Sequence, residues 1–420
     1  MKKRLFSIAS LLLVGFIAQA QEVKFEEYDL DNGLHVILHQ DNSAPVVTTA
    51  VMYDVGGKDL GGNDNPKRTG FAHFFEHLLF EGTKNIGRGQ WFKIVSSNGG
   101  SNNANTSQDR TYYYEVFPSN NLELGLWMES ERMLHPVINQ IGVDTQSEVV
   151  KEEKRLRYDN QPYGQLLFAV SENIFKKHPY KHKNIGEMEH LDAATLDEFK
   201  AYFKKFYVPN NATLVVAGDI NVAETKKMIK DYFGTIPRGK DVVRNFPKED
   251  AITEQSRVKY EDPNIQIPAI IAAYRTPGFT TKDARVLDMI STYLSGGKSS
   301  KLYKRLVEDK KMSLAVQAFN FSQKDYGIYG IFSLPIGENT LDDLLAEIDD
   351  EIKKLQTELI SEKDYQKLQN KFENNFVNSN SSVEGIANSL ARFNVMHGDT
   401  NLINTEIDIY RSVTREEIGR

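Results

Sequence analysis

The sequence has no cysteine among its 420 residues. Disulfide bonds and a lipid anchor on a cysteine are therefore excluded. Any zinc ion that the chain binds would have to be held by histidine, aspartate or glutamate.

The chain also lacks an excess of positive charge. Its net charge is −7, so the composition gives no support for nucleic-acid binding. Hydrophobic residues make up 40% and charged residues 26%, which is ordinary for a globular protein. A chain of 420 residues is long enough for two or three domains, each with its own core.

Long apolar runs are missing beyond the N-terminus. Residues 1–20 combine a basic start at Lys2, Lys3 and Arg4 with a short apolar stretch, residues 5–17, and an A-x-A pattern ending at Ala20. This pattern predicts a signal peptide cleaved after Ala20, with an uncleaved anchor as the alternative. An exported chain without cysteine fits a bacterial periplasm, and outright secretion is the alternative. No other run is long enough to cross a membrane.

The most informative stretch is residues 69–83, which contains His73, Glu76 and His77 in the order H-x-x-E-H. Residues four apart lie on the same face of a helix, so the two imidazoles can approach one atom. The surrounding phenylalanines and leucines predict a buried helix, where unpaired polar groups are costly. The order is the inverted zinc hydrolase motif. The alternative is a buried helix whose polar groups are satisfied without a metal.

A hydrolytic zinc ion needs a third protein ligand, and Glu153 is the best candidate. Its helical neighbours Val149, Val150 and Leu156 predict that it lies on an apolar stripe. A buried carboxylate needs a positive partner. That partner is either the metal or Arg157, four residues further along a helix.

The order of predicted elements indicates an α+β fold of two similar α/β sandwich units, each an antiparallel-rich sheet covered by helices. We expect an N-terminal unit at 21–236, a charged linker with one edge strand at 237–265, and a second unit at 266–420 without a metal site. Single helices are expected at 144–157 and 191–206. The chain ends inside a predicted helix, so we expect the C-terminal unit to be truncated.

The motif, the spaced Glu153 and the later segments at 103–113, 207–219 and 294–303 resemble the pitrilysin/insulysin family of zinc metallopeptidases. The likeness is to the short-chain branch that includes mitochondrial processing peptidase, and it spans nearly all of residues 25–420. It implies Zn²⁺ on His73, His77 and Glu153, with Glu76 as catalytic base. It also implies that an extended peptide pairs with an edge strand whose residues are Asn103, Ala104, Asn105 and Thr106.

Two departures from the family pattern bear on activity. Gln146 stands where the family tends to have a second acidic residue. Val307 and Leu314 stand where an arginine and a tyrosine often bind substrate in the second unit. The resemblance implies a zinc endopeptidase working inside a dimeric chamber, either a homodimer or a heterodimer with a related zinc-free chain. The alternative is a non-catalytic peptide-binding or scaffold subunit.

Overall fold

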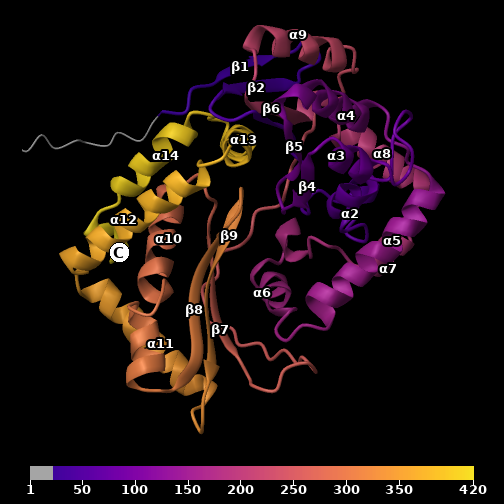
Figure 1. Ribbon diagram of the computed structural model, residues 1–420. Helices are drawn as coiled ribbons and strands as arrows, with labels where there is room; N and C mark the ends of the chain where they lie inside the picture. Colours follow the sequence, from indigo (N-terminus) through magenta and orange to yellow (C-terminus); the bar gives the residue numbers. More distant parts are fainter. Residues whose placement is uncertain (1–21) are drawn as a thin grey trace, which may run out of the picture.

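The computed structural model describes residues 22–420, and it contains two α/β units that follow one another along the chain (Figure 1). The predicted signal peptide, residues 1–20, lies outside the described residues. Each unit has a β-sheet with helices packed against it, which confirms the predicted α+β class. No helix in residues 22–420 is long and apolar enough to cross a membrane.

The first unit contains a six-stranded sheet in the order β1-β2-β6-β3-β5-β4. Neighbouring strands are antiparallel except for β2 and β6, which run parallel. The strand β4 lies at one edge and pairs only with β5. The strands are β1 (Glu26–Asp29), β2 (His35–Gln40), β3 (Val46–Tyr53), β4 (Ser101–Thr106), β5 (Thr111–Pro118) and β6 (Ala212–Gly218).

Helices of the first unit cover one face of this sheet and enclose the largest core. That core is rich in aromatic rings, which bury large areas for each residue. The helices of this half are α1 (Gly61–Asp64), α2 (Phe71–Leu78), α3 (Trp91–Ser97), α4 (Leu122–Leu134), α5 (Gln140–Lys154), the π-helix η2 (Arg155–Asp159), α6 (Leu166–Ile174), α7 (Met188–Asp192), α8 (Leu196–Phe206) and α9 (Val222–Phe233).

The opposite face of the first sheet is covered by α13 (Val383–Arg392), which comes from the far end of the chain. Ile386 and Leu390 of this helix pack with Ile37 and Met52 of the sheet. Local sequence patterns do not reveal this contact, because the contacting residues are more than three hundred positions apart. Both faces of the sheet are therefore buried, and Ile37 is fully buried.

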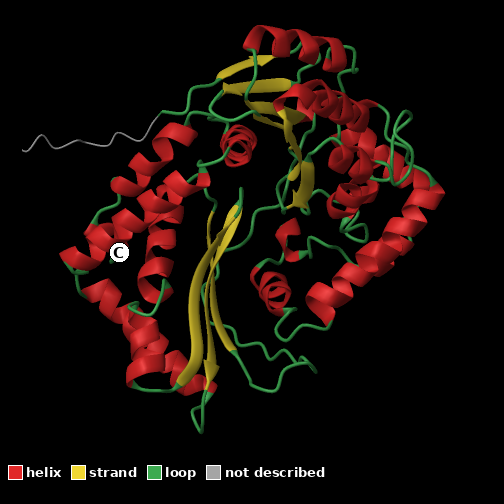
Figure 2. Cartoon of the chain, in the orientation of Figure 1, coloured by secondary structure: helices red, strands yellow, loops and turns green. Residues whose placement is uncertain are grey.

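The second unit contains an antiparallel sheet in the order β7-β9-β8. Figure 2 shows its strands in yellow with helices on both sides. One face packs against α10 and α11, and the other packs against α6 from the first half. Each half therefore contributes a helix to the other half's sheet. The elements are β7 (Ile270–Pro277), α10 (Lys282–Ser295), the π-helix η5 (Tyr303–Asp309), β8 (Ser313–Ser322), β9 (Tyr326–Pro335), α11 (Leu341–Thr357), α12 (Glu362–Ser379), the π-helix η6 (Phe393–His397), α14 (Leu402–Arg411) and α15 (Arg415–Ile418).

Three local predictions differ from the structure. The edge strand expected in the linker is absent, since 237–269 contains no helix or strand. This segment is largely exposed and is held by side-chain contacts. The helix expected at 144–157 begins earlier, at Gln140, where Asn139 caps it. The helix expected at 191–206 is two helices, because Thr195 forms a capping box that starts α8 afresh.

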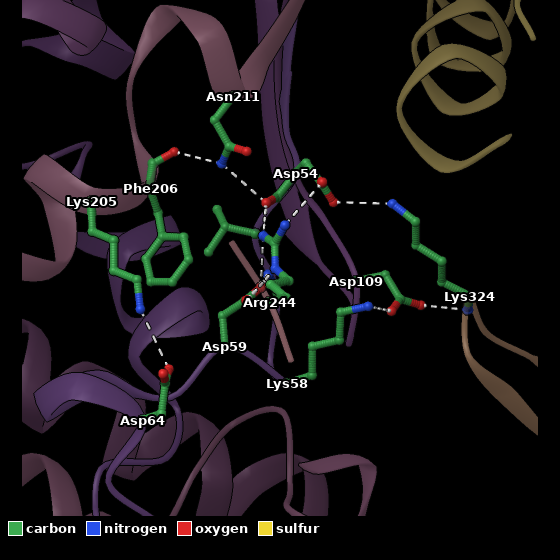
Figure 3. A network of polar contacts seen from close by, with 12 residues as sticks. Asp54, Lys58, Asp59, Asp64, Asp109, Lys205, Phe206, Asn211, Arg244 and Lys324 are labelled. Carbon is green, nitrogen blue, oxygen red and sulfur yellow. Dashed lines mark hydrogen bonds and ion pairs between the residues drawn. The ribbon is translucent and has the colours of Figure 1, made fainter. Parts of the chain in front are cut away.

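A network of buried ion pairs joins the two halves close to the β4–β5 turn. Lys58 lies 2.8 Å from Asp109 and 2.8 Å from Asp325 of the second half. Arg244 of the linker pairs with Asp54 and Asp59 (Figure 3). Breaking a buried pair is strongly destabilising, so these contacts fix the position of the second half relative to the first sheet.

Candidate metal centre

The helix that carries the motif is held in the core by its aromatic residues. Phe71 and Phe74 of α2 stack on Phe199 of α8, with ring centroids 4.8 Å apart in each case. Gly70, the residue just before the helix, has a positive φ of 81° and lies against Gly186 so closely that a side chain would meet backbone atoms. The aromatic face is thereby turned inward.

The C-terminal end of α2 is held by a buried arginine. The Arg132 guanidinium donates a hydrogen bond to the carbonyl of Leu79 at 3.2 Å. It also pairs with Glu115 at 3.1 Å and Glu129 at 3.0 Å, and all three side chains are fully buried. The Tyr113 hydroxyl donates to the carbonyl of Phe75 at 2.9 Å. Sequence patterns alone do not identify these residues, because their role depends on contacts between distant segments.

The structure brings together the three residues proposed as metal ligands. Glu153 lies near the end of α5, and its Oε2 atom is 3.1 Å from Nε2 of His77 and 3.4 Å from Nε2 of His73. One possible ligand atom from each residue lies within 4.8 Å of the others. Figure 1 shows α2 and α5 on the same side of the first sheet. Among residues 22–420, this is the one cluster of its kind.

The chemistry of this cluster suits a divalent cation. Two imidazoles and a carboxylate form a ligand set that zinc hydrolases use. Nδ1 of His73 and Oε2 of Glu153 are buried, and neither has a hydrogen-bond partner within the described chain. Burial would raise the pKa of Glu153, but the imidazoles of His73 and His77 that face it outweigh burial and hold the pKa well below its usual range. The two imidazoles therefore favour the ionised form of the Glu153 carboxylate.

Glu153 contacts both Arg157 and the two histidines. Its Oε1 atom lies 2.9 Å from Arg157, while Oε2 faces the two histidines. The expected apolar stripe is only partly present. Val150 is fully buried, but Val149 of α5 and Leu156 of η2 are exposed.

Glu76 lies beside the cluster without belonging to it. Its Oε2 atom accepts a hydrogen bond from the Thr106 hydroxyl at 2.6 Å. Thr106 is the last residue of the edge strand β4. A carboxylate that is left out of the ligand set and faces a strand edge is positioned to exchange a proton with a group held there.

The four residues expected to bind substrate lie in β4, and they alternate between the two faces of the sheet. The backbone N–H of Ser107 donates to the backbone carbonyl of Arg110 across the turn between β4 and β5. In an antiparallel pair the bonded positions alternate, so the backbone groups of Ala104 and Thr106 point away from β5. The N–H of Ala104 donates to the side chain of Asn103 at 2.9 Å, and the carbonyl of Thr106 accepts from Asn184 at 2.9 Å. Side chains therefore already hydrogen-bond two of these outward backbone groups.

The departures noted in the sequence occupy defined places. Gln146 donates to Glu81 at 2.6 Å. Val307 is partly buried against the second core, and Leu314 is exposed on β8. Neither side chain can donate a hydrogen bond.

The fold, with its cluster of two histidines and a glutamate, is that of a peptidase-like hydrolase. Residues 35–187 match the family model described as "Insulinase (Peptidase family M16)", and residues 193–372 match "Peptidase M16 inactive domain". The chain belongs to peptidase family M16. The family assignment confirms the resemblance found in the sequence.

Three similar proteins support this assignment. The chain is 32% identical to a zinc protease named PqqE from Helicobacter pylori, over 78% of this chain and 74% of that protein. It is 23% identical to an Arabidopsis thaliana protein named "Probable mitochondrial-processing peptidase subunit beta, mitochondrial", over 88% of this chain and 70% of that protein. The crystal structure of a protease from Helicobacter pylori superposes with a TM-score of 0.85 at 27% identity and covers 95% of each chain.

Proposed function

We propose that the protein is a zinc-dependent endopeptidase that hydrolyses extended peptides or unfolded protein segments. The observation that carries this proposal is the position of Glu76. It lies beside the three candidate ligands and contacts the edge strand through Thr106 at 2.6 Å. A scaffold helix would need neither the ligand cluster nor a separate carboxylate next to it.

In this proposal His73, His77 and Glu153 hold one Zn²⁺ ion per chain. When bound, such an ion lowers the pKa of a coordinated water towards about 7 and polarises a carbonyl oxygen. Glu76 accepts a proton on its carboxylate and later delivers it to the leaving amine. Thr106 orients the Glu76 carboxylate through its hydroxyl.

The peptide would add to the sheet along β4, at Asn103, Ala104, Asn105 and Thr106. The outward backbone groups of Ala104 and Thr106 are those that a new strand would pair with. The side chains of Asn103 and Asn184 would have to release these groups first. Backbone pairing recognises an extended chain more than a particular sequence, so unfolded segments are the expected substrates.

A second chain would complete the chamber in this proposal, either a second copy or a related zinc-free subunit. Val307 and Leu314 offer no hydrogen-bond donors, which supports a partner that supplies them. The proposed location is the periplasm, with secretion as the alternative. It rests on the N-terminal sequence pattern, residues 1–20.

A second function, a peptide-binding or scaffold subunit without turnover, is favoured by the same two side chains. One experiment separates it from the first. The purified protein is assayed for zinc content and for cleavage of an internally quenched unfolded peptide, with and without a chelator. The variant Glu76→Gln is compared with Glu152→Gln, a matched change on an exposed neighbour of Glu153.

We expect Glu76→Gln to keep its zinc and to lose about 100-fold or more in kcat, because it removes the proton acceptor. Glu152→Gln should behave like the parent protein. Zinc retained by the parent without any cleavage would refute the endopeptidase and leave the binding function. A parent protein that binds no zinc would refute the assigned ligands.

A further inference from the structure

A cavity of about 270 Å³ lies at the junction of the two halves, beyond the turn between β4 and β5. It is bounded by Arg110 of that turn, by Arg285 of α10 and by Arg392 of α13. The α14 helix adds Glu406. None of these residues belongs to the metal cluster.

The lining carries more positive charge than its carboxylates balance. Arg285 lies 3.1 Å from Glu406, and Arg392 lies 3.6 Å from a second oxygen of the same carboxylate. Two guanidinium groups therefore share one acid. Nε of Arg285 is buried and has no hydrogen-bond partner among residues 22–420. Arginine stays charged in proteins, so the imbalance persists at all ordinary pH values.

The other acid on the wall, Asp288, does not restore the balance. It accepts hydrogen bonds from Asn320 at 2.9 Å and from Tyr410 at 2.8 Å, so its oxygens are already engaged. Burial raises the pKa of this carboxyl above its usual range. Burial also lowers the pKa of the imidazole of His397, next to Arg392, so it adds no charge near neutral pH.

Arg110 connects this cavity to the edge strand. Its guanidinium donates to the backbone carbonyl of Asn105 at 2.9 Å and contacts the Asn105 side chain. No carboxylate of the described residues lies within ion-pair distance of Arg110. The cavity therefore begins where the proposed peptide-binding edge ends, and the arginine at its mouth has no acidic partner.

We propose that this cavity is a subsite for a carboxylate of the bound peptide, held by Arg110 and Arg392. The carboxylate comes from an acidic side chain or from the C-terminus of the peptide, and guanidinium groups recognise both. The cavity has room for one side chain or a chain end. This subsite rests on the proposed function, because it needs a peptide that lies along β4.

The test measures binding without requiring turnover. Glu76→Gln protein loaded with zinc is titrated with fluorescent peptides that are identical except for charge. In one set of pairs, Glu is exchanged for Gln at one position of the peptide after another. In a further pair, the C-terminal carboxylate is exchanged for an amide. Each pair is measured against the Glu76→Gln parent and against that parent carrying Arg110→Gln, Arg392→Gln or, as the control, Arg257→Gln. Arg257 is an exposed arginine far along the linker that pairs with Asp342.

We expect the parent to bind one acidic member about tenfold or more tightly than its neutral counterpart, as for a charge-assisted hydrogen bond. Arg110→Gln and Arg392→Gln should reduce this ratio towards one, whereas Arg257→Gln should keep it. The pair that shows the preference identifies the source of the carboxylate. Arg392 is partly exposed, so its variant tests the cavity even where Arg110→Gln fails to fold.

A ratio near one in the parent, or a ratio that survives both cavity variants, overturns the subsite. This outcome is distinct from failure of the proposed function. Wild-type protein that cleaves neutral and acidic peptides equally refutes only the subsite. A charge preference in binding together with no cleavage by wild type refutes only the peptidase.

Discussion

Arg132 is expected to be the side chain on which the geometry of the metal site depends most, although it lies outside the ligand set. Its guanidinium is fully buried between Glu115 and Glu129 and stacks over the rings of Trp91 and Phe80, at 4.0 and 4.5 Å from their centroids. It also donates to the last turn of α2. The change Arg132→Met keeps most of the volume and removes the charge and every donor.

The expected cost follows from the buried Glu129 carboxylate, which this change leaves without its cationic partner. Removing one partner of a buried ion pair costs about 3–5 kcal/mol. A unit of about 200 residues loses about 2–4 °C in melting temperature per kcal/mol, so a fall of about 6–20 °C is expected. The loss of the hydrogen bond to Leu79 should loosen α2, so the zinc affinity should fall as well.

Two further variants show whether the charge is the cause. Burial and the neighbouring Glu129 raise the pKa of Glu115 well above its usual range, so Glu115 is expected to be protonated. Glu115→Gln should then cost about 1 kcal/mol or less, because a neutral group replaces a neutral group. Arg257→Met, at an exposed ion pair, should cost less than about 0.5 kcal/mol.

The assay is thermal and urea unfolding of the three variants, followed by zinc titration of the folded proteins. The reasoning would be refuted if Arg132→Met were as stable as Arg257→Met. It would also be refuted if Glu115→Gln were as destabilising as Arg132→Met. The first result would mean that the Glu129 carboxylate relaxes into water. The second would mean that Glu115 is ionised in the folded protein.

Three other predictions concern the metal and pH. Glu153→Gln should reduce the zinc content measured by atomic absorption by at least about tenfold, while Glu152→Gln leaves it unchanged; equal zinc in both would remove Glu153 from the ligand set. Chelation should lower the unfolding free energy of the zinc-loaded protein by about 2.7 kcal/mol when free zinc had been at 100 times its Kd, and an unchanged melting curve would argue against a bound ion. Burial, together with Arg392 and Arg285, lowers the pKa of His397 from 6.5 to about 3. As the pH falls, the His397 imidazole therefore binds a proton in the unfolded state before it does so in the folded state. The stability that the neutral imidazole contributes is complete above about pH 6.5 and is lost as pH falls towards 3. Between pH 7 and pH 5, the unfolding free energy of His397→Gln measured with urea should fall by about 1 kcal/mol less than that of wild type, after allowance for partial exposure of the imidazole. Equal falls in the two proteins would contradict the lowered pKa of His397.

Local pattern in the sequence was enough for the parts that repeat within a few residues. The spacing of His73 and His77 predicted one face of one helix, and the phenylalanines between them predicted its burial, because helical periodicity is a property of neighbouring residues. The capping residues Asn139 and Thr195 also lie in the sequence, but their effect on the helix ends was not anticipated.

The tertiary structure alone decided what those helices and strands meet. The sequence had already indicated Glu153 as a partner of the two histidines, through its spacing and the family resemblance, but only the fold set Glu76 against Thr106 and placed Arg132 beneath α2. It also laid α13 over the sheet of the first unit, whose strands are distant from it in the sequence, and gathered Arg110, Arg285 and Arg392 around one cavity. The sequence carries these residues but not their neighbours, since contacts between distant segments depend on how whole layers pack and on which buried charges find partners.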